Sequence, residues 1–415
     1  MKKRTPVFSF PKEKINILLL EGLHKNAVEY FRSMGYSTIT YIDHALDQET
    51  LRAKIADAHV IGIRSRTQLK PDLLAHADKL LAVGCFCIGT NQVDMAKARE
   101  LGIVVFNAPH SNTRSVAELV IAEMIMLKRG IFDKNKLMHS GVWQKSAKDA
   151  YELRGKTLGI IGYGNIGSQL SVLAESLGIQ VIFYDTGAKL PLGNARPVKS
   201  LNELLQSADL VTLHVPQTAE TANMIGEAQI MQMKKGAVLI NASRGNVIDI
   251  AALTKALETR HLAGAAIDVF PQEPSSNQEP FVSPLQHLEN VILTPHIGGS
   301  TLEAQANIGL EVADKLVKYL DTGSTATAVN FPEVALPSQA GRHRILHTHK
   351  NIPGVLGKVN QCFSELEINI HAQYLQTHNG LGYVVLDVDA NQQASEAIIK
   401  KLSSMPETIR ARVLF

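Results

Sequence analysis

The sequence is poor in cysteine and tryptophan, carries little net charge and contains no apolar run as long as a membrane span. Its three cysteines are Cys85, Cys87 and Cys362. An odd, small count in a chain of 415 residues indicates a reducing cytoplasm rather than a disulfide framework. No second ligand pair follows Cys85 and Cys87 at zinc spacing, so we expect no metal site.

A net charge of +3 without a long lysine or arginine run gives no sign of nucleic-acid binding. The first residues are charged but lack the apolar core of a signal peptide, which also favours the cytoplasm. The single tryptophan, Trp143, lies in a polar stretch, where it either packs within the chain or anchors a neighbouring surface. What remains is a globular protein of ordinary composition, with 45% hydrophobic residues.

Apolar runs alternate with helical patterns over the first hundred residues. The runs 15–21, 59–63 and 80–84 have the length and composition of buried strands. This alternation predicts a parallel sheet covered by helices. Residues 106–114 are rich in turn formers and predict a break, and a long helical pattern follows at 115–129.

The segment LGIIGYGNIG, residues 158–167, is the most informative stretch of the chain. An apolar run ends in Gly162, Gly164 and Gly167, and a helical pattern begins there, as in dinucleotide-binding turns. The glycines allow the turn, the approach of a pyrophosphate and close packing of the helix. Asp185 follows the next predicted strand, about 20 residues on, where a carboxylate binds the adenosine ribose. That carboxylate would repel a 2′-phosphate, so we expect NAD rather than NADP.

Three later segments each follow a predicted strand of the same domain. They contain Arg244, Glu273 and His296, and the carboxyl ends of such strands form the ligand crevice of a doubly wound sheet. An arginine can hold a carboxylate with two parallel hydrogen bonds, and a histidine can exchange a proton near neutral pH. A neighbouring glutamate would orient the ring and favour its charged form. The set suits hydride transfer on a 2-hydroxy acid.

Arg64, Ser65 and Arg66 directly follow the predicted strand 59–63 of the first domain. Two arginines at a strand end can bind a carboxylate or a phosphate, although surface arginines also occur there. Beyond residue 341 the pattern reads βαββαβ, which predicts a ferredoxin-like domain. Its cluster of His347, His349 and Asn351 either binds a ligand or belongs to a dimerisation module.

The segments GIIGYGNIG, NASRGNVID, AAIDVFPQEP and LTPHIGGST together resemble the signature blocks of the D-2-hydroxyacid dehydrogenases. Nearly the whole chain is similar to the bacterial members that oxidise D-3-phosphoglycerate and carry one C-terminal ACT domain. The resemblance implies an α/β fold: two doubly wound, Rossmann-like parallel-sheet domains and a ferredoxin-like ACT domain. The implied layout is a discontinuous substrate-binding domain at 1–111 and 299–340, an NAD-binding domain at 112–298 and the ACT domain at 341–415.

By this resemblance, Arg244 binds the substrate carboxylate, and Glu273 and His296 form the acid/base pair. The residues expected to face the substrate are Arg64, Ser65, Arg66, Asn112 and Arg244. Those expected to line NAD are Gly162, Gly164, Asn165, Ile166, Gly167, Asp185, Ala242, Ser243, Arg244, Asp268, His296, Ile297, Gly298 and Gly299. Some members carry a lysine after the second strand; this chain has none at 41–45, and His44 is the open candidate for that contact.

The implied reaction is NAD-dependent oxidation of D-3-phosphoglycerate to 3-phosphohydroxypyruvate by a homotetramer, at the start of L-serine synthesis and under feedback inhibition by L-serine. Serine would contact His349, Asn351 and Asn369, although Ile352 stands where relatives often have arginine. Reduction of 2-oxoglutarate to 2-hydroxyglutarate is a further implied activity. Two other hypotheses stay open: a dehydrogenase of a different 2-hydroxy acid, and a non-catalytic NADH-sensing protein on the same fold.

Overall fold

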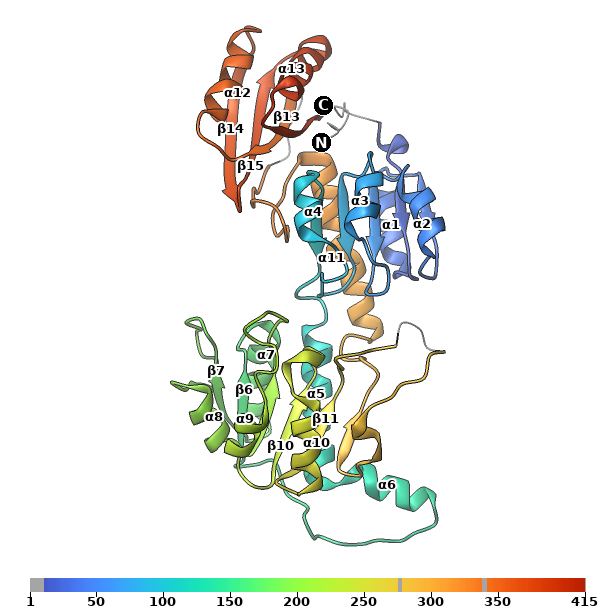
Figure 1. The fold of residues 1–415 in the computed structure, drawn as a ribbon, viewed down its shortest axis with the longest axis vertical. Helices are drawn as coiled ribbons and strands as arrows, with labels where there is room; N and C mark the ends of the chain where they lie inside the picture. Colours follow the sequence, from blue (N-terminus) through green and yellow to red (C-terminus); the bar gives the residue numbers. More distant parts are fainter. Residues whose placement is uncertain (1–10, 275–277, 338–341, 415) are drawn as a thin grey trace. The chain divides into compact units, whose positions relative to one another are not determined.

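The computed structural model describes residues 11–274, 278–337 and 342–414. The chain divides into two compact units (Figure 1). One comprises the described parts of Met1–Pro109 and Gln305–Phe415, and the other is His110–Ala304. The expected domain boundaries near residues 111 and 298 stay predictions, and the boundary at 340–341 lies outside the described residues.

The first unit contains a five-stranded parallel sheet in the order β2-β1-β3-β4-β5. Its strands are β1 (Ile17–Leu19), β2 (Ile39–Tyr41), β3 (Val60–Ile63), β4 (Ala82–Cys85) and β5 (Val104–Asn107). The covering helices include α1 (Lys25–Ser33), α2 (Gln48–Ile55), α3 (Pro71–His76), α4 (Met95–Glu100) and α11 (Leu302–Thr322). Apolar side chains are buried on both faces, as expected for a doubly wound sheet.

The expected break at 106–114 begins too early. Phe106 and Asn107 end strand β5, and the Phe106 ring is fully buried in the core beside Tyr319 of α11, with ring centroids 6.0 Å apart. Burial of this aromatic side chain outweighs the turn-forming residues that follow it. The strand therefore extends two residues into the segment that local composition assigned to a turn.

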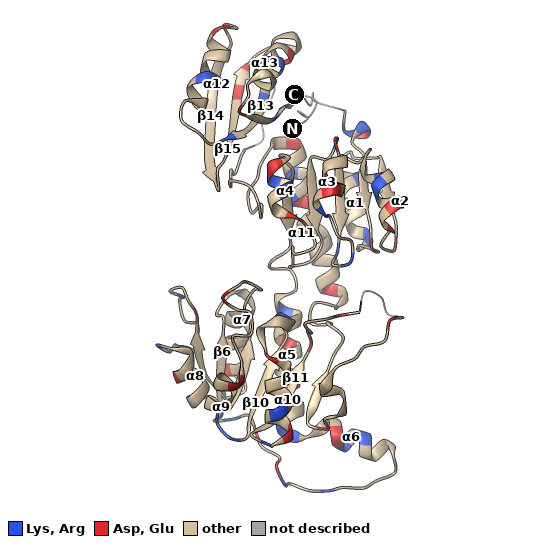
Figure 2. Cartoon of the chain, in the orientation of Figure 1, with Lys and Arg blue, Asp and Glu red and all other residues tan. Residues whose placement is uncertain are grey.

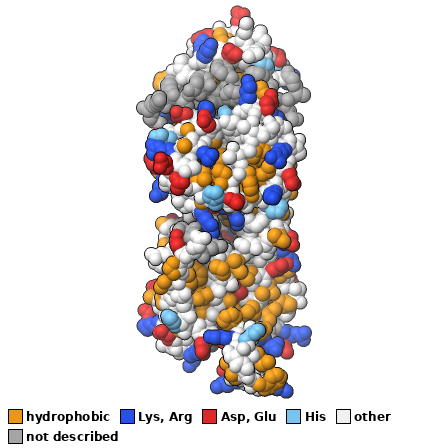
Figure 3. All heavy atoms as spheres, turned by 90° about the vertical axis from the view of Figure 1, so that its right-hand side faces the viewer, with side chains coloured by type: hydrophobic (Ala, Val, Ile, Leu, Met, Phe, Trp, Pro, Cys, Tyr) orange, Lys and Arg blue, Asp and Glu red, His pale blue; other side chains and the backbone are white. Residues whose placement is uncertain are grey.

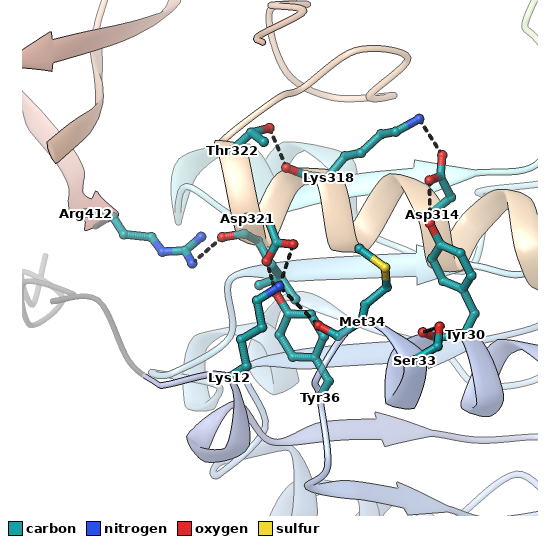
Figure 4. A network of polar contacts seen from close by, with 11 residues as sticks. Lys12, Tyr30, Ser33, Met34, Tyr36, Asp314, Lys318, Asp321, Thr322 and Arg412 are labelled. Atoms are coloured by element: carbon teal, nitrogen blue, oxygen red, sulfur yellow. Dashed lines mark hydrogen bonds and ion pairs between the residues drawn. The ribbon is translucent and has the colours of Figure 1, made fainter. Parts of the chain in front are cut away.

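Helix α11 brings a distant part of the sequence back onto this sheet. A side chain at Gly84 of β4 would collide with Val312 and Leu316 of α11, so the helix lies directly on the strand. Figure 4 shows the polar contacts along the helix: Asp321 accepts hydrogen bonds from Lys12 at 2.7 Å and from the Tyr36 hydroxyl at 2.5 Å. These bonds fasten the returning helix to the N-terminal half of the unit.

The C-terminal segment of the same unit forms an antiparallel sheet in the order β14-β15-β13-β16. Its elements are β13 (His343–Lys350), α12 (Val355–Ser364), β14 (Asn369–His378), β15 (Leu381–Asp389), α13 (Gln392–Ser404) and β16 (Thr408–Leu414). Helices α12 and α13 share one hydrophobic core with the sheet. The expected ferredoxin-like βαββαβ arrangement is confirmed.

The second unit is built on a seven-stranded parallel sheet in the order β12-β11-β10-β9-β6-β7-β8. The strands are β6 (Thr157–Ile161), β7 (Gln180–Tyr184), β8 (Arg196–Pro197), β9 (Leu210–Leu213), β10 (Ala237–Asn241), β11 (Leu262–Ile267) and β12 (Val291–Leu293). Chain order reverses between β6 and β9, and ligands of doubly wound sheets bind at such a point. Helices α5 (Thr113–Arg129), α7 (Asn165–Ser176), α8 (Leu201–Ser207), α9 (Glu227–Gln232) and α10 (Ile250–Glu258) accompany the sheet.

Helix α6 (Ile131–His139) has no buried residue, and the sequence analysis did not predict it. The loop after it carries Trp143, a residue that is 77% exposed. Of the two alternatives for this tryptophan, packing within the chain is therefore the wrong one. Figure 3 shows hydrophobic side chains gathered on one face of the second unit.

Acidic and basic side chains are interspersed along the ribbon (Figure 2), in keeping with the small net charge. Among the described residues, no helix is long and apolar enough to cross a membrane. The same residues contain no group of three or more histidine, cysteine, aspartate or glutamate side chains placed to hold a metal ion.

Candidate active site

The three glycines of the β6–α7 turn play different steric roles. A Cβ atom on Gly162, whose φ is +91°, would lie 2.3 Å from the carbonyl oxygen of His214. A Cβ atom on Gly167 would lie 2.4 Å from the Gly162 carbonyl oxygen, so only glycine lets helix and strand approach so closely. Nothing lies within 4 Å of the corresponding position on Gly164. This open space at a helix N-terminus, where backbone N–H groups lack helical partners, fits a pyrophosphate.

Asp185 follows β7 and lies next to this turn. Its Oδ2 accepts a hydrogen bond from the backbone N–H of Tyr163 at 2.8 Å, and its Oδ1 accepts one from Gly187 at 2.9 Å. The carboxylate is thus held rigidly beside the glycines while lone pairs remain for a ribose hydroxyl. Residues Gly162 to Gly167 and Asp185 together form a site that a dinucleotide fits.

Arg244 lies in the loop after β10, and the side chain of Asn241, the last residue of that strand, holds this loop by hydrogen bonds. The Asn241 side-chain oxygen accepts hydrogen bonds from the N–H and the hydroxyl of Ser243, at 3.0 and 2.8 Å, and its amide donates to the Arg244 carbonyl at 2.9 Å. The Arg244 guanidinium itself donates to the Ser243 carbonyl at 2.6 Å. A cation is thereby fixed at the carboxyl end of the sheet.

The structure brings Glu273 and His296 together. The His296 Nδ1 atom lies 2.8 Å from Glu273 Oε2, and the other carboxylate oxygen accepts the Phe270 N–H at 3.1 Å. The two side chains are 37% and 49% exposed, so a ligand can reach them. Because Nδ1 faces the carboxylate, the other ring nitrogen of His296, Nε2, is directed away from Glu273.

Electrostatics favour a charged pair. The hydrogen bond from Glu273 raises the pKa of His296 above its ordinary value, and burial opposes that shift only in part. Burial acts to raise the pKa of Glu273, but the hydrogen bond and the charge of His296 outweigh it, so this pKa lies below its ordinary value. A carboxylate beside an imidazole stabilises the imidazolium, as an acid/base histidine requires.

Asp268, at the end of β11, positions the loop that carries His296. It is 1% exposed, and its oxygens accept hydrogen bonds from the Thr294 hydroxyl at 2.6 Å and from the N–H groups of Ile297 and Gly298, both at 2.8 Å. Burial raises its pKa even though these bonds oppose the shift. His296 has a φ of +54°, an uncommon backbone conformation for a non-glycine residue, and the hydrogen bonds from Asp268 hold the residues next to it.

Asn112 lies at the N-terminus of α5, against the turn after His296. A Cβ atom on Gly299 would lie 2.5 Å from the Asn112 side-chain nitrogen, and the Asn112 side-chain oxygen is buried without a partner among the described residues. An unsatisfied buried acceptor is uncommon and can mark a ligand contact. Its expected role toward the substrate stays a prediction.

The expected substrate arginines, Arg64 and Arg66, follow β3 in the other unit, with Ser65 exposed between them. Their backbone is held by Glu21, which the sequence analysis did not single out. His44, the open candidate for the missing lysine, is 68% exposed and contacts Asp43 at 2.7 Å. Glu21, like Asn241 and Asp268, is a polar residue that directly follows or ends an apolar run, and that pattern is the sequence signal that could have identified it.

The expected serine ligands do not meet within one chain. His349 is 3% exposed on β13, opposite Gly382 of β15, and its Nε2 has no partner among the described residues. Asn351 follows β13 at that end of the sheet. Asn369, in contrast, pairs with Asp389, seven residues farther along β15, and lies at the other end, roughly 20 Å away.

Comparison with known proteins identifies two domains of the chain and related folds. Residues 121–298 match the model of the D-isomer specific 2-hydroxyacid dehydrogenase NAD-binding domain, and residues 345–410 match an AHAS small subunit-like ACT domain. A D-2-hydroxyisocaproate dehydrogenase structure superposes with a TM-score of 0.67 at 27% identity, over 76% of this chain and all of that one. A D-lactate dehydrogenase from Aquifex aeolicus, solved with NAD and lactic acid, gives 0.66 at 25% identity, over 74% and 95% of the two chains.

Sequence relatives match over almost the full length. The D-3-phosphoglycerate dehydrogenase of Escherichia coli K12 is 57% identical over 407 residues, which cover 98% of this chain and 99% of that one. The enzyme of the same name from Dictyostelium discoideum is 50% identical over 410 residues, 99% and 100% of the two chains. With its NAD-binding domain and C-terminal ACT domain, the chain belongs to the D-3-phosphoglycerate dehydrogenase family of D-isomer specific 2-hydroxyacid dehydrogenases.

Proposed function

We propose that this chain oxidises D-3-phosphoglycerate to 3-phosphohydroxypyruvate with NAD, the first step of L-serine synthesis. One observation carries the proposal: the 2.8 Å contact of His296 with Glu273 at the strand ends of an NAD-binding domain. The relatives support this substrate, because two that are named for phosphoglycerate match 98% and 99% of the chain. Bound NAD supplies a nicotinamide ring that accepts the hydride from the substrate carbon.

His296 is the base in the direction of oxidation. Its Nε2 takes the hydroxyl proton of the substrate as the hydride leaves, and the ring becomes an imidazolium that the Glu273 carboxylate stabilises. In the direction of reduction the same imidazolium returns the proton. Glu273 holds the ring through Nδ1, so that Nε2 is the nitrogen offered to the substrate.

Arg244 binds the carboxylate next to the reacting carbon, and Asn112 hydrogen-bonds the substrate beside it. Arg64 and Arg66 take the distal phosphate, because two planar guanidinium groups match the oxygens of that dianion. A distal carboxylate would suit them as well. This is the reason for proposing 2-oxoglutarate, reduced to 2-hydroxyglutarate, as a second substrate.

The test is a substrate panel with purified protein. NADH formation should require D-3-phosphoglycerate, and NADH oxidation with 2-oxoglutarate should be measurable but slower. No turnover with any 2-hydroxy or 2-oxo acid would overturn the proposal. It would leave the alternative of a non-catalytic NADH-binding protein, against which the assembled Glu273–His296 pair argues.

The ACT domain is proposed to bind L-serine between two copies of the chain. Because Asn369 lies at the opposite end of the sheet from His349 and Asn351, one site with all three ligands needs Asn369 from a second copy. Serine should inhibit turnover, and calorimetry should show heat of binding that His349→Ala and Asn369→Ala each abolish. Full binding in either variant would refute this site.

We also propose that the chain forms a homotetramer in the cytoplasm. The exposed Phe132, Met138 and Trp143, on and after α6, offer an apolar surface for a second copy. Cys85, Cys87 and Cys362 form no disulfide, which suits a reducing compartment. Light scattering would give the mass in solution, and a monomer at micromolar concentration would refute the assembly.

A further inference from the structure

Glu21 occupies an unusual position directly after β1. Its side chain is buried, with 8% of the residue exposed, and its φ of +65° lies in the left-handed region that non-glycine residues rarely adopt. A strained residue persists where its surroundings hold it, and such residues concentrate at functional sites. The side chain of Glu21 shows what is held here.

The carboxylate of Glu21 receives three backbone N–H groups from the loop after β3. Its Oε1 accepts from Arg64 at 3.1 Å and from Thr67 at 2.9 Å, and its Oε2 accepts from Arg66 at 3.0 Å. Converging backbone N–H groups of this kind make an anion-binding nest, and charge-assisted bonds are the stronger ones. The nest is filled by a side chain of the protein itself.

Gln92 holds the same loop from its other side. It is 3% exposed, and its side-chain nitrogen donates to the Arg64 carbonyl at 2.8 Å. The N–H and the C=O of Arg64 are therefore both bonded to buried side chains, one after β1 and one after β4. The Glu21 N–H in turn donates to the His44 carbonyl at 3.1 Å, which ties in the loop after β2.

We propose that Glu21 is a positioning residue for substrate selectivity. It fixes the loop after β3, so that the side chains of Arg64 and Arg66 bind the distal phosphate and the backbone N–H groups of the loop do not. The proposal rests on the proposed function and adds to it a residue that touches no substrate. With the nest already filled, phosphate recognition falls to the two guanidinium groups. Their placement then depends on a backbone that Glu21 holds.

The test compares two substrates that differ only in the phosphate. 3-Phosphohydroxypyruvate and hydroxypyruvate are reduced with NADH by the wild type, Glu21→Gln and the control Glu29→Gln, an exposed residue of α1. In Glu21→Gln one oxygen becomes an NH₂ group, which cannot accept a bond from the loop. We expect kcat/KM for the phosphorylated acid to fall about 10- to 100-fold, mainly through KM. For hydroxypyruvate it should change less than about threefold, and Glu29→Gln should match the wild type on both.

An equal loss on both substrates would mean a merely structural role and would overturn the proposal, as would full retention of the phosphate preference. NADH binding and the thermal midpoint report whether each variant is folded. If Glu21→Gln does not fold, Gln92→Met, which loses the bond to the Arg64 carbonyl, carries the same comparison with the same expected result. If the wild type shows no preference for the phosphorylated acid, the proposed substrate is wrong. If the wild type shows this preference and Glu21→Gln retains it, only the proposed role of Glu21 is wrong.

Discussion

The two parallel sheets begin with the same strand–turn–helix unit but use the turn in opposite ways. After β1, Glu21 and Gly22 both have positive φ, and the Glu21 carboxylate accepts hydrogen bonds from three N–H groups of the neighbouring loop. After β6, Gly162 has positive φ and the side of Gly164 is open. The first turn holds a protein loop, and the second leaves room for a cofactor. The two sheets share this topology, so the difference comes from the residues in the turn, which either bond a neighbouring loop or leave space for a ligand.

The contrast extends to acidic side chains. Glu21 is buried with three donors, whereas Glu273 is partly exposed and faces one imidazole. Glu123 on α5 is 2% exposed, and neither of its oxygens has a partner among the described residues. Glu21 thus holds a loop through its backbone N–H groups, and Glu273 raises the pKa of His296. Glu123 is a buried carboxyl group whose own pKa is raised, which favours its protonated form.

The largest effect is expected at the acid/base pair. His296→Ala removes the only group proposed to take the substrate proton, so kcat should fall about 10²- to 10⁴-fold. NADH affinity, measured by fluorescence titration, should remain. The control is His287→Ala, an exposed histidine of the same unit. A His296→Ala enzyme with more than a tenth of wild-type turnover would contradict the acid/base role.

The open turn can be closed by adding a side chain. Gly164→Val places atoms where the structure has none within 4 Å, so the fold should persist while the dinucleotide is excluded. We expect the Kd for NADH to rise about tenfold or more. Gly357→Ala, at another open glycine with negative φ, should leave it unchanged. Unaltered NADH affinity in Gly164→Val would show that the cofactor does not pass this turn.

A stability measurement separates Glu123 from the partnered glutamates. Burial, with a smaller contribution from the Asp268 charge, raises the pKa of Glu123 to about 8. The unfolded chain ionises this group near its ordinary pKa of 4.5, so unfolding releases a proton between these pH values, and stability falls as pH rises through that window.

Glu123→Gln should therefore match the wild type near pH 5 and exceed its unfolding free energy near pH 8 by about 1–3 kcal/mol. Thermal midpoints at the two pH values measure the difference. The exposed Glu258→Gln should shift neither. A Glu123→Gln protein that is less stable at pH 8 would mean that the carboxylate has a partner in solution.

The smallest expected change is in a pH profile. Oxidation needs neutral His296, so kcat/KM should rise with pH through the raised pKa of this histidine. Glu273→Gln removes the main cause of that shift, and the midpoint should move to lower pH, toward the ordinary histidine value. Initial rates across pH 5–9 would show it. An unchanged midpoint would mean that Glu273 does not act on the titrating group.

Local pattern predicts an element well where burial and composition agree. The run QVIFY forms β7 at the predicted residues, and Pro71–His76 is helical as expected, with proline at its start. Helix α6 was missed because it buries no face and so lacks the apolar periodicity by which helices are identified. Strand β5 was cut short because turn formers follow it directly.

For the site, the sequence by itself determined which residue types follow which strands. The glycine turn, Asp185, Arg244, Glu273 and His296 can be identified from the order of apolar runs and polar ends, because parallel strands present their carboxyl ends at one edge. Tertiary structure decided the geometry. The pairing of Glu273 with His296 was already expected from the resemblance, whereas the hydrogen bonds by which Asp268 holds the loop that carries His296, and the separation of Asn369 from His349, depend on register and long-range packing. The role of Glu21 arises in the same way, because its three donors lie more than forty residues away, and only the folded sheet brings them to its carboxylate.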